Sequence, residues 1–317
     1  MAARFVADVG GTNIRLAREV EGKLVGIKKY LCNDYETIAD AIKAYMADFP
    51  DLIFEAGCIG IACPVNNDLI IMTNHTWRFS VKELQQQLGL KWLHVINDYT
   101  AVSMSLPVLS DSQKIQIGPG EIKPRENIAV FGPGTGLGVG HLVPTVDGWQ
   151  CLDGEGGHVD LPVYNKEDLI VWEFLREKYG YASAEEALSG RGIAQIYQAL
   201  AEHKNQPVEF TEPSDITQRA LDGSCTLCVA ALSRFCALMG TFAGNLALNV
   251  GAHGGVYIAG GIAQRFVEFL KQSDFRTRFE AKGRFQQYVA DIPTFVITEP
   301  DHGLIGAAAY LAQNFKG

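Results

Sequence analysis

Apolar and polar positions alternate in short runs over the first third of the chain, and turn-forming residues separate the runs. Apolar runs at 4–9, 56–63 and 93–96 predict buried strands, because short apolar runs bounded by turn residues are typical of covered sheets. Two further β runs flank the turn Glu21-Gly22 and end near Tyr30. The chain is therefore expected to open with a β meander.

Helical periodicity follows the meander. Apolar residues recur at helical spacing between Tyr35 and Phe49, and Pro50 ends that pattern. Ser80-Val81-Lys82-Glu83 has the form of a capping box and predicts a second helix that ends at Gly89. This half of the chain predicts an α/β domain.

The pattern restarts after a polar stretch at 107–125, rich in proline and glycine, where we place a domain crossover. Strands are predicted at 128–131 and 256–258, with a large helical insertion at 166–248 between them. A last helix at 304–315 is expected to pack back on the first domain. The predicted domains are therefore 1–108 completed by 303–317, and 109–302.

Composition describes an ordinary globular chain of 317 residues, 47% hydrophobic and 20% charged, long enough for two domains. The net charge of −9 disfavours nucleic acid or an anionic membrane as a partner, because those surfaces are bound through basic patches. No segment has the form of a signal peptide, and the apolar stretch 236–250 is too short to span a bilayer. We expect a cytoplasmic protein.

Seven cysteines at irregular spacing do not suggest a disulfide framework. Cys225-x-x-Cys228 is the one suggestive spacing, and it lies in a helical stretch without a second pair at zinc spacing. Buried thiols are favoured over a zinc site there.

Three segments share the order of an apolar strand followed by a glycine turn. They are Ala7-Asp8-Val9-Gly10-Gly11-Thr12, Gly132-Pro133-Gly134-Thr135-Gly136-Leu137-Gly138 and Ala259-Gly260-Gly261. Paired glycines let backbone N–H groups converge on an anion, and a carboxylate such as Asp8 can hold the metal ion that accompanies phosphate. A Walker A sequence is absent, and no register of 132–138 fits the dinucleotide fingerprint.

Asn97-Asp98 follows a strand, at the edge where open α/β sheets place ligands. Phosphoryl transfer to an alcohol needs a carboxylate to accept the hydroxyl proton, and Asp98 fits that role. The structural alternative is that Asp98 caps the helix beginning near Thr100. Beside three glycine turns of this kind, the catalytic interpretation is favoured.

The loop Gly154-Glu155-Gly156-Gly157-His158-Val159-Asp160 presents acceptors and a histidine close together, as sugar hydroxyls require. A solvated surface loop and a metal site are the alternatives, although Glu155 and His158 alone are a thin ligand set. Local sequence does not select Glu185 over Glu186.

These motifs occur in an order that resembles the bacterial glucokinase family over essentially the whole chain. Met72-Thr73-Asn74-His75-Thr76-Trp77 and Leu188-Ser189-Gly190 extend the resemblance. The related repressor-and-kinase sugar family has a cysteine-rich zinc signature after its sugar histidine. Here His158 is followed by Val159-Asp160-Leu161-Pro162, which excludes that branch.

The resemblance implies a two-domain actin-like ATPase (ribonuclease H-like) fold, with duplicated mixed-sheet halves and a central cleft that closes on the sugar. It implies transfer of the ATP γ-phosphate to the 6-hydroxyl of glucose, with Asp98 as general base. The remaining sugar ligands would be Asn97, Glu155, His158 and Glu185.

The same resemblance assigns the nucleotide contacts to the three glycine turns, and Mg²⁺ to Asp8, through water. Alanine at position 7 departs from the glycine usual in the family. A homodimer is also implied. The alternatives are a kinase for another hexose, an actin-like or chaperone-like ATPase, and a catalytically silent sugar sensor; the sugar-ligand set and Asp98 count against the last two.

Overall fold

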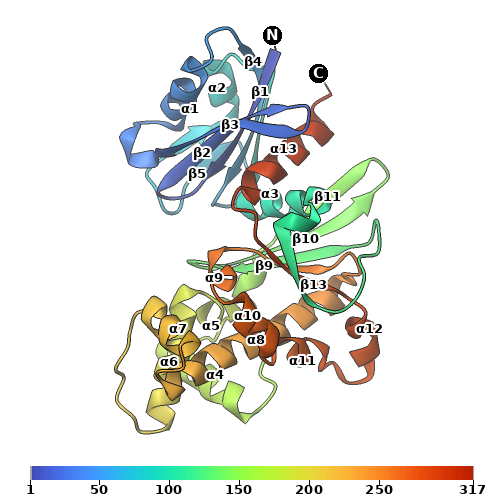
Figure 1. The fold of residues 1–317 in the computed structure, drawn as a ribbon. Helices are drawn as coiled ribbons and strands as arrows, with labels where there is room; N and C mark the ends of the chain where they lie inside the picture. Colours follow the sequence, from blue (N-terminus) through green and yellow to red (C-terminus); the bar gives the residue numbers. More distant parts are fainter. Residues whose placement is uncertain (1, 317) are drawn as a thin grey trace. The chain divides into compact units, whose positions relative to one another are not determined.

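The computed structural model describes residues 2–316 and divides into two compact units (Figure 1). Of the described residues, unit 1 comprises 2–110, 146–151 and 299–316, and unit 2 comprises 111–145 and 152–298. The sequence places the crossover at 107–125 and assigns 146–151 to the second domain, whereas in the structure that hairpin tip groups with unit 1.

Unit 1 is built on a mixed five-stranded sheet in the order β3-β2-β1-β4-β7. β1, β2 and β3 are antiparallel neighbours, whereas β4 is parallel to both β1 and β7. The strands are β1 (Ala2–Val9), β2 (Asn13–Val20), β3 (Lys23–Leu31), β4 (Ile53–Ile61), β5 (Leu69–Ile71), β6 (Arg78–Ser80) and β7 (Trp92–Asn97). The small β5–β6 hairpin was not predicted, because its strands are only three residues long.

Helices cover both faces of this sheet. They are α1 (Ile38–Ala47), α2 (Val81–Gln87), α3 (Asp98–Ser105) and α13 (His302–Asn314), with 3-10 turns at η1 (Cys32–Asp34) and η2 (Leu106–Val108). α1 starts three residues later than predicted because Thr37 and Asp40 form a capping box. Ser80 caps α2 as predicted, accepting from the Glu83 N–H at 3.2 Å.

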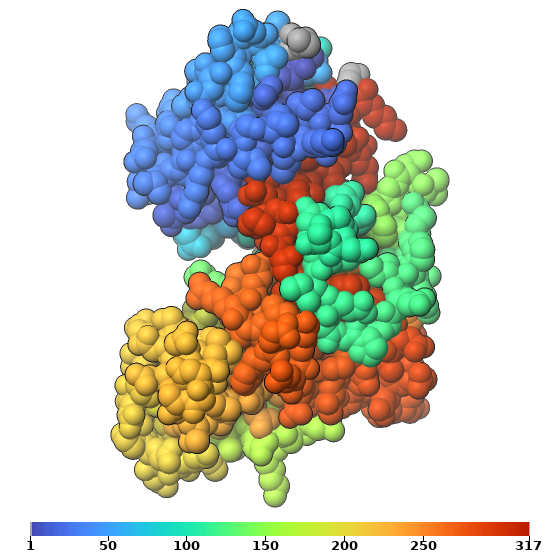
Figure 2. All heavy atoms as spheres, viewed as in Figure 1, coloured from blue at the N-terminus to red at the C-terminus, as the bar shows by residue number. Residues whose placement is uncertain are grey.

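The C-terminal helix α13 packs against α3, β1 and β4 of unit 1, as the sequence predicts. In the space-filling view its red atoms lie directly beside the blue N-terminal strands (Figure 2). The close approach to α3 depends on Gly306, because a Cβ there would lie 1.6 Å from the Ala101 carbonyl oxygen.

Unit 2 repeats the strand arrangement of unit 1. Its six-stranded sheet has the order β11-β10-β9-β12-β13-β8. β9 is antiparallel to β10 and parallel to β12, and β12 is parallel to β13, so β9 and β12 correspond to β1 and β4. The strands are β8 (Lys114–Gly118), β9 (Ile128–Pro133), β10 (Leu137–Thr145), β11 (Gly148–Leu152), β12 (Val256–Ile258) and β13 (Thr294–Ile297). The duplication expected from the resemblance is present in the strand order.

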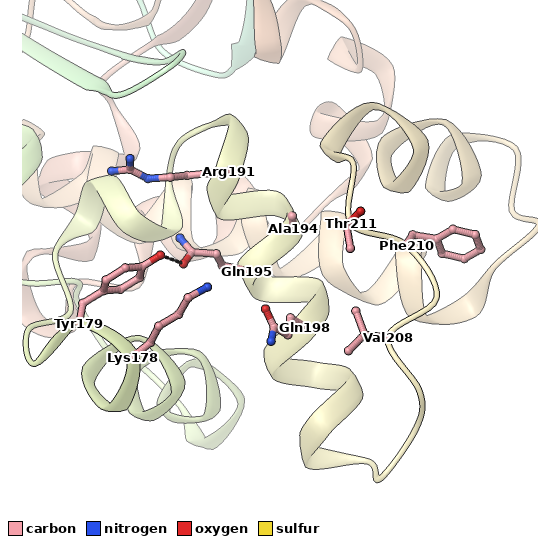
Figure 3. A pocket seen from close by; sticks show the side chains of 9 residues that line it. All are labelled: Lys178, Tyr179, Arg191, Ala194, Gln195, Gln198, Val208, Phe210 and Thr211. Carbon is pink, nitrogen blue, oxygen red and sulfur yellow. Dashed lines mark hydrogen bonds between the residues drawn. The ribbon is translucent and has the colours of Figure 1, made fainter.

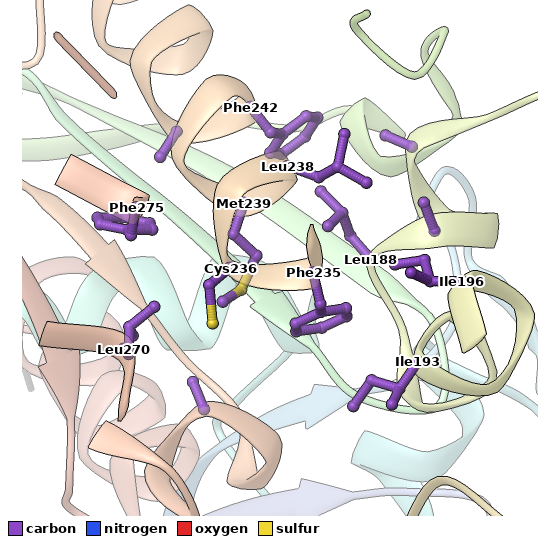
Figure 4. Close-up of a cluster of buried hydrophobic side chains, with 14 of the residues drawn as sticks. Leu188, Ile193, Ile196, Phe235, Cys236, Leu238, Met239, Phe242, Leu270 and Phe275 are labelled. Carbon is purple, nitrogen blue, oxygen red and sulfur yellow. The ribbon is translucent and has the colours of Figure 1, made fainter. Parts of the chain in front are cut away.

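The helical insertion lies between β11 and β12, as the sequence predicts. The helices of unit 2 are α4 (Lys166–Tyr179), α5 (Ala184–Ala187), α6 (Gly190–His203), α7 (Pro213–Leu221), α8 (Thr226–Val250), α9 (Gly261–Gln264), α10 (Val267–Gln272), α11 (Phe275–Glu280) and α12 (Gln286–Ala290), with 3-10 turns η3 (Asp111–Gln113), η4 (Gly156–His158) and η5 (Gly283–Phe285). Phe235, Met239 and Phe242 of α8 form the centre of the core (Figure 4).

α8 corrects the length argument made from sequence. The helix that contains the stretch 236–250 begins at Thr226, and its 25 residues are long and apolar enough to cross a membrane by length and composition. However, 78% of its most apolar 18-residue window is buried inside the structure. The helix continues through Gly240 and Gly244. Glycine at these two positions allows α11 to pack closely, because a Cβ at either would meet the backbone of α11, at Phe275 and Phe279.

Candidate active site

Three parallel strands of unit 1 end side by side at one edge of the sheet. The register pairs Val9 with Ile61, and Ile61 with Asn97. Since neighbouring strands lie about 4.8 Å apart, the ends of β1 and β7 are roughly 10 Å apart. Asp8 and Asp98, predicted separately from the sequence, therefore lie along the same edge.

Asn97 and Asp98 form the junction between β7 and α3. Asn97 is the N-cap, since its Oδ1 accepts from the Tyr99 N–H at 2.9 Å while its Nδ2 donates to the Cys63 carbonyl at 3.2 Å. Asp98 Oδ1 also accepts from the Tyr99 N–H, at 3.0 Å. However, Asp98 is the first residue of the helix and not its N-cap. The capping role considered for Asp98 thus belongs mainly to Asn97.

Burial raises the pKa of Asp98 to about 6, and the charge of Asp8 adds to this, although the hydrogen bond from Tyr99 opposes it. A carboxyl with a pKa near 6 is ionised at neutral pH and is basic enough to accept a proton efficiently. This combination of position and basicity suits a general base.

Asp8 faces the start of α13. Its carboxylate lies 3.3 Å from the Arg15 guanidinium, and a Cβ on Gly303 would sit 3.1 Å from its Cγ. Arg15 also donates to Asp301 Oδ1 at 3.0 Å and to the Pro300 carbonyl at 2.8 Å. Burial raises the pKa of Asp8 and the Arg15 charge opposes that rise.

The first glycine turn has little room for side chains. A Cβ at Gly11 would lie 2.9 Å from both the Cβ and the carbonyl oxygen of Asn74, and the Gly10 N–H donates to the Asn13 carbonyl at 2.9 Å. Thr12 is exposed, whereas Ala7 and Val9 are in the core. Ala7 and Val9 can therefore offer a ligand only their backbone.

Trp77 packs in the core of unit 1, 3% exposed, with its indole N–H donating to the Tyr35 carbonyl at 3.3 Å. Packing, rather than a sugar contact, accounts for this side chain. Asn74 is exposed beside Gly11.

The second glycine turn, Gly134-Thr135-Gly136, joins β9 to β10 in unit 2. The Gly134 N–H donates to the Gly136 carbonyl and the Gly190 N–H donates to the Gly134 carbonyl, both at 2.8 Å. Thr135 is exposed at the tip. The first residue of the 14-residue helix α6 therefore lies against this turn.

The Ser189 hydroxyl immediately precedes α6 and is fully buried, without a hydrogen-bond partner among residues 2–316. Backbone N–H groups at a helix start, beside a glycine turn, form an environment that favours anions. The orphaned hydroxyl gives this environment one further polar group.

Glu185 connects the second glycine turn to α6. Its Oε2 accepts from the Leu137 N–H at 2.9 Å, and its Oε1 accepts from Arg191 at 3.0 Å. A Cβ at Gly136 would lie 2.5 Å from Glu185 Oε2, so a larger residue there would displace the carboxylate. These contacts distinguish Glu185 from Glu186, which the sequence alone does not.

A chain of hydrogen bonds leads from Glu185 away from the second glycine turn. Arg191 also donates to Glu186 at 2.7 Å, and Gln195 donates to the Glu186 carbonyl at 2.7 Å. The Tyr179 hydroxyl donates to Gln195 at 2.6 Å. Arg191, Gln195 and Tyr179 line a surface pocket of about 240 Å³ together with Phe210 and Lys178 (Figure 3).

Glu155 and His158 are exposed on the loop around η4. The loop packs on β10, since a Cβ at Gly157 would lie 2.0 Å from the Leu137 carbonyl oxygen. It also contacts the start of α5, where the Ala184 N–H donates to the Val159 carbonyl at 2.8 Å. The loop that carries Glu155 and His158 thus contacts Leu137 through Gly157, and Glu185 contacts the same residue through its carboxylate.

The third glycine turn lies against the second. Gly260 has φ +85°, and a Cβ there would lie 2.9 Å from the Pro133 carbonyl oxygen, while Gly261 begins α9 and has no atom within 4 Å of a Cβ. Next to it is a small pocket of about 80 Å³, lined by Gly190, Ile193, Pro213, Ser214, Thr217, Ile262, Arg265 and Phe266.

The sequence did not indicate that three arginines would lie beside the candidate site residues and the small pocket: Arg15, Arg191 and Arg265. Arg191 carries a recognisable signal, because a cation in the first turn of a helix opposes the helix dipole and is expected to have an acidic partner nearby. Among the described residues no cluster of three or more metal-ligating side chains occurs.

Comparison with known proteins identifies the family of the chain. The family model described as Glucokinase matches residues 5–314. The chain is 50% identical to a protein named glucokinase from Tolumonas auensis, over 98% of this chain and 97% of that protein.

Solved structures are similar as well. A glucokinase from an Antarctic psychrotroph is 34% identical, with a TM-score of 0.93, covering 98% of this chain and 99% of that one. A ROK family glucokinase from Streptomyces griseus, solved with glucose and AMPPNP, is 20% identical with a TM-score of 0.64, covering 98% and 100%. The second likeness concerns the fold alone, and the two together confirm the actin-like ATPase fold.

Proposed function

The chain belongs to the glucokinase family, and we propose on this basis that it transfers the γ-phosphate of ATP to the 6-hydroxyl of glucose. The observation that carries the chemistry is Asp98, a carboxyl at the end of β7 whose burial raises its pKa to about 6. A coupled assay with a panel of hexoses and of phosphoryl donors tests the proposal. Turnover of glucose with ATP is expected, and its absence would overturn it.

Asp98 is proposed to accept the proton of the 6-hydroxyl as that oxygen attacks the γ-phosphate. The transition state of phosphoryl transfer is mostly stabilised by positioning and electrostatics, so the base has to be fixed rather than strong. Asn97 fixes it by joining Cys63, in the segment after β4, to the first turn of α3.

The sugar contacts are proposed to be Asn97 and Asp98 of unit 1, and Glu155, His158 and Glu185 of unit 2. The exposed Glu155 and His158 present groups that pair with sugar hydroxyls. Glu185 is held by the Leu137 N–H, so its position depends on the conformation of the second glycine turn.

ATP is the donor that a sugar-kinase family implies. Its phosphates are proposed to contact the backbone of 7–12 and of 134–136, and its adenosine the Gly260-Gly261 turn. The Cβ distances at Gly11 and Gly260 support close backbone packing at the first and third turns, and at Gly136 the Glu185 carboxylate takes the place of a side chain. The adjacent 80 Å³ pocket, with Ile262, Arg265 and Phe266, is the proposed start of the adenine site.

Mg²⁺ is proposed to be held by Asp8 through water. Magnesium takes only one or two protein carboxylates beside substrate phosphates, which fits a lone Asp8 whose side chain is 25% exposed. When bound, the ion would neutralise phosphate charge. Removal of divalent ions with EDTA should abolish activity and Mg²⁺ should restore it; full activity after chelation would contradict the assignment.

A cytoplasmic location and a homodimer are further proposals, the latter from the family resemblance alone. Light scattering coupled to size exclusion measures the dimer directly. A kinase for another hexose is the second candidate function, because epimer discrimination depends on the exact placement of Glu155, His158 and Glu185; the hexose panel separates the two.

A further inference from the structure

Two cysteines stand one turn apart at the start of α8, away from the glycine turns described above. Cys225 is the N-cap, with extended backbone at φ −135° and ψ 112°. Its Sγ accepts from the Cys228 N–H at 3.4 Å. This position is usually taken by Ser, Thr, Asp or Asn, because the N-cap side chain must accept a hydrogen bond. A thiolate accepts better than a thiol, so the site favours the ionised form of Cys225.

The two thiols have opposite surroundings. Cys225 is partly exposed, next to the exposed turn 221–224, whereas Cys228 is fully buried. Burial acts to raise the pKa of Cys225, but hydrogen bonds from the Cys228 and Leu227 N–H groups and from the Cys228 thiol outweigh it and leave the pKa lowered. Burial raises the pKa of Cys228 to about 12.

This asymmetry distinguishes the pair from the other cysteines. Cys32, Cys58, Cys63, Cys151 and Cys236 are all buried. A zinc site at 225–228 is not supported, because the described residues contain no group of three metal-ligating side chains.

Spacing also suits a covalent bond. Side chains three residues apart on a helix have Cβ atoms about 5–6 Å apart, and a disulfide needs about 4 Å. The extended backbone of Cys225 lies outside the helix proper, and its Sγ already lies 3.4 Å from the backbone nitrogen of Cys228, so the two side chains are neighbours.

We propose that Cys225 and Cys228 are a reversible dithiol–disulfide pair, a redox modification site that is independent of the kinase reaction. The oxidant is a low-molecular-weight disulfide such as glutathione disulfide. The Cys225 thiolate attacks one sulfur of that disulfide and releases one thiolate, which leaves a mixed disulfide on Cys225. Cys228 then loses its proton, attacks Cys225 Sγ and releases the second thiolate.

The two electrons lost by the protein thiols reduce the small disulfide to two thiols, and the two protein thiol protons end on them. Cys225 is the exposed nucleophile and Cys228 the buried resolving thiol, which is the order that thiol–disulfide exchange requires.

The test titrates the folded, reduced protein with glutathione disulfide, then alkylates it under denaturing conditions, so that buried thiols also react, and maps the products by mass spectrometry. The native protein should lose two of its seven alkylatable thiols, in one intramolecular disulfide linking 225 and 228. Cys228→Ser should stop at a mixed disulfide on Cys225, and Cys225→Ser should form neither product. Cys236→Ser, at a buried cysteine on the same helix, is the matched control and should behave like the native protein.

Retention of glucose phosphorylation by the reduced variants, with native circular dichroism, shows that they are folded. If all seven thiols of the native protein remain alkylatable, or if Cys228→Ser accumulates no mixed disulfide, the proposal is wrong. Disulfides mapping to other cysteine pairs in folded protein would overturn it as well.

Discussion

At the scale of single residues, Asp98 carries the first prediction. Asp98→Asn should lower kcat by about 10²- to 10⁴-fold, the usual contribution of a general base, because the amide cannot accept the hydroxyl proton. Glucose affinity should change little, since asparagine keeps the shape and the hydrogen bond to Tyr99. Rates from the coupled assay and binding by calorimetry separate the two. The control is Asp48→Asn, a partly exposed carboxylate paired with Lys28; near-normal kcat in Asp98→Asn would contradict the assignment.

The raised pKa of Asp98 gives a second prediction at this scale. Its pKa is about 6 in the folded chain against 3.8 ordinarily, so the folded state binds the proton first as pH falls. The activity of free enzyme should therefore fall as pH drops through about 6, whereas the contribution of this group to stability should rise between about 6 and 4. The pH profile of kcat/KM and urea unfolding measure the two effects. Asp98→Asn should remove this contribution to the pH dependence of unfolding; an unchanged dependence would show that Asp98 has an ordinary pKa.

At the scale of elements, Glu185 shows how far sequence reasoning reached and where it stopped. The strands that end at Val9, next to Asp8, and at Asn97 were predictable, because apolar runs bounded by turns indicate strands and parallel strands end at a common edge. The choice of Glu185 over Glu186 came from the family resemblance and not from local sequence, because the contact that distinguishes Glu185 is with an N–H of β10 that lies 48 residues away in sequence. Local patterns report which side chains begin a helix, but not which distant backbone group they meet.

The pairing of α5 with α6 predicts a role for Arg191. Arg191→Ala should raise the KM for glucose about two- to five-fold with a smaller effect on kcat, since Glu185 loses one of the two groups that fix it and a partly exposed ion pair contributes up to about 1 kcal/mol. Arg191→Lys should recover part of the loss. Arg176→Ala on the exposed face of α4 is the control. Equal KM values in Arg191→Ala and the native protein would show that Glu185 needs no such support.

The contact between the second and third glycine turns predicts an effect on the nucleotide. Gly260→Ala should raise the KM for ATP more than that for glucose, because its Cβ would lie 2.9 Å from the Pro133 carbonyl oxygen and push the two turns apart. Gly180→Ala is a matched control, since Gly180 also has positive φ, at +78°, but no atom within 4 Å of a Cβ. Steady-state kinetics with each substrate varied in turn gives both constants. If both variants raise the two KM values equally, backbone strain and not the contact is responsible.

At the scale of the whole molecule, the repeated strand order explains why the proposed ligand set is divided. β1, β4 and β7 of unit 1 correspond in order to β9, β12 and β13 of unit 2, so each sheet supplies its own glycine turn after its first strand. The units differ in the residues that come after their later strands. Unit 1 places Asp98 after β7, whereas unit 2 places the Gly260-Gly261 turn after β12. Duplication thus provides two phosphate-type turns, and divergence provides the base and the adenosine turn.

This division predicts that glucose stabilises both units at once. A ligand held by Asn97 and Asp98 together with Glu155, His158 and Glu185 should slow amide hydrogen exchange at 96–100 in unit 1 and at 155–160 in unit 2, over the same range of glucose concentration. Glu155→Ala changes unit 2 only, yet it should weaken the protection of 96–100, because a ligand that binds less tightly protects every group it contacts less at a given concentration. Exchange measured by mass spectrometry across a glucose titration checks this. Exposed Glu21→Ala, in the turn between β2 and β3, is the control. Protection confined to one unit, or protection of 96–100 that is unaffected by Glu155→Ala, would show that one sugar does not contact both sets of residues.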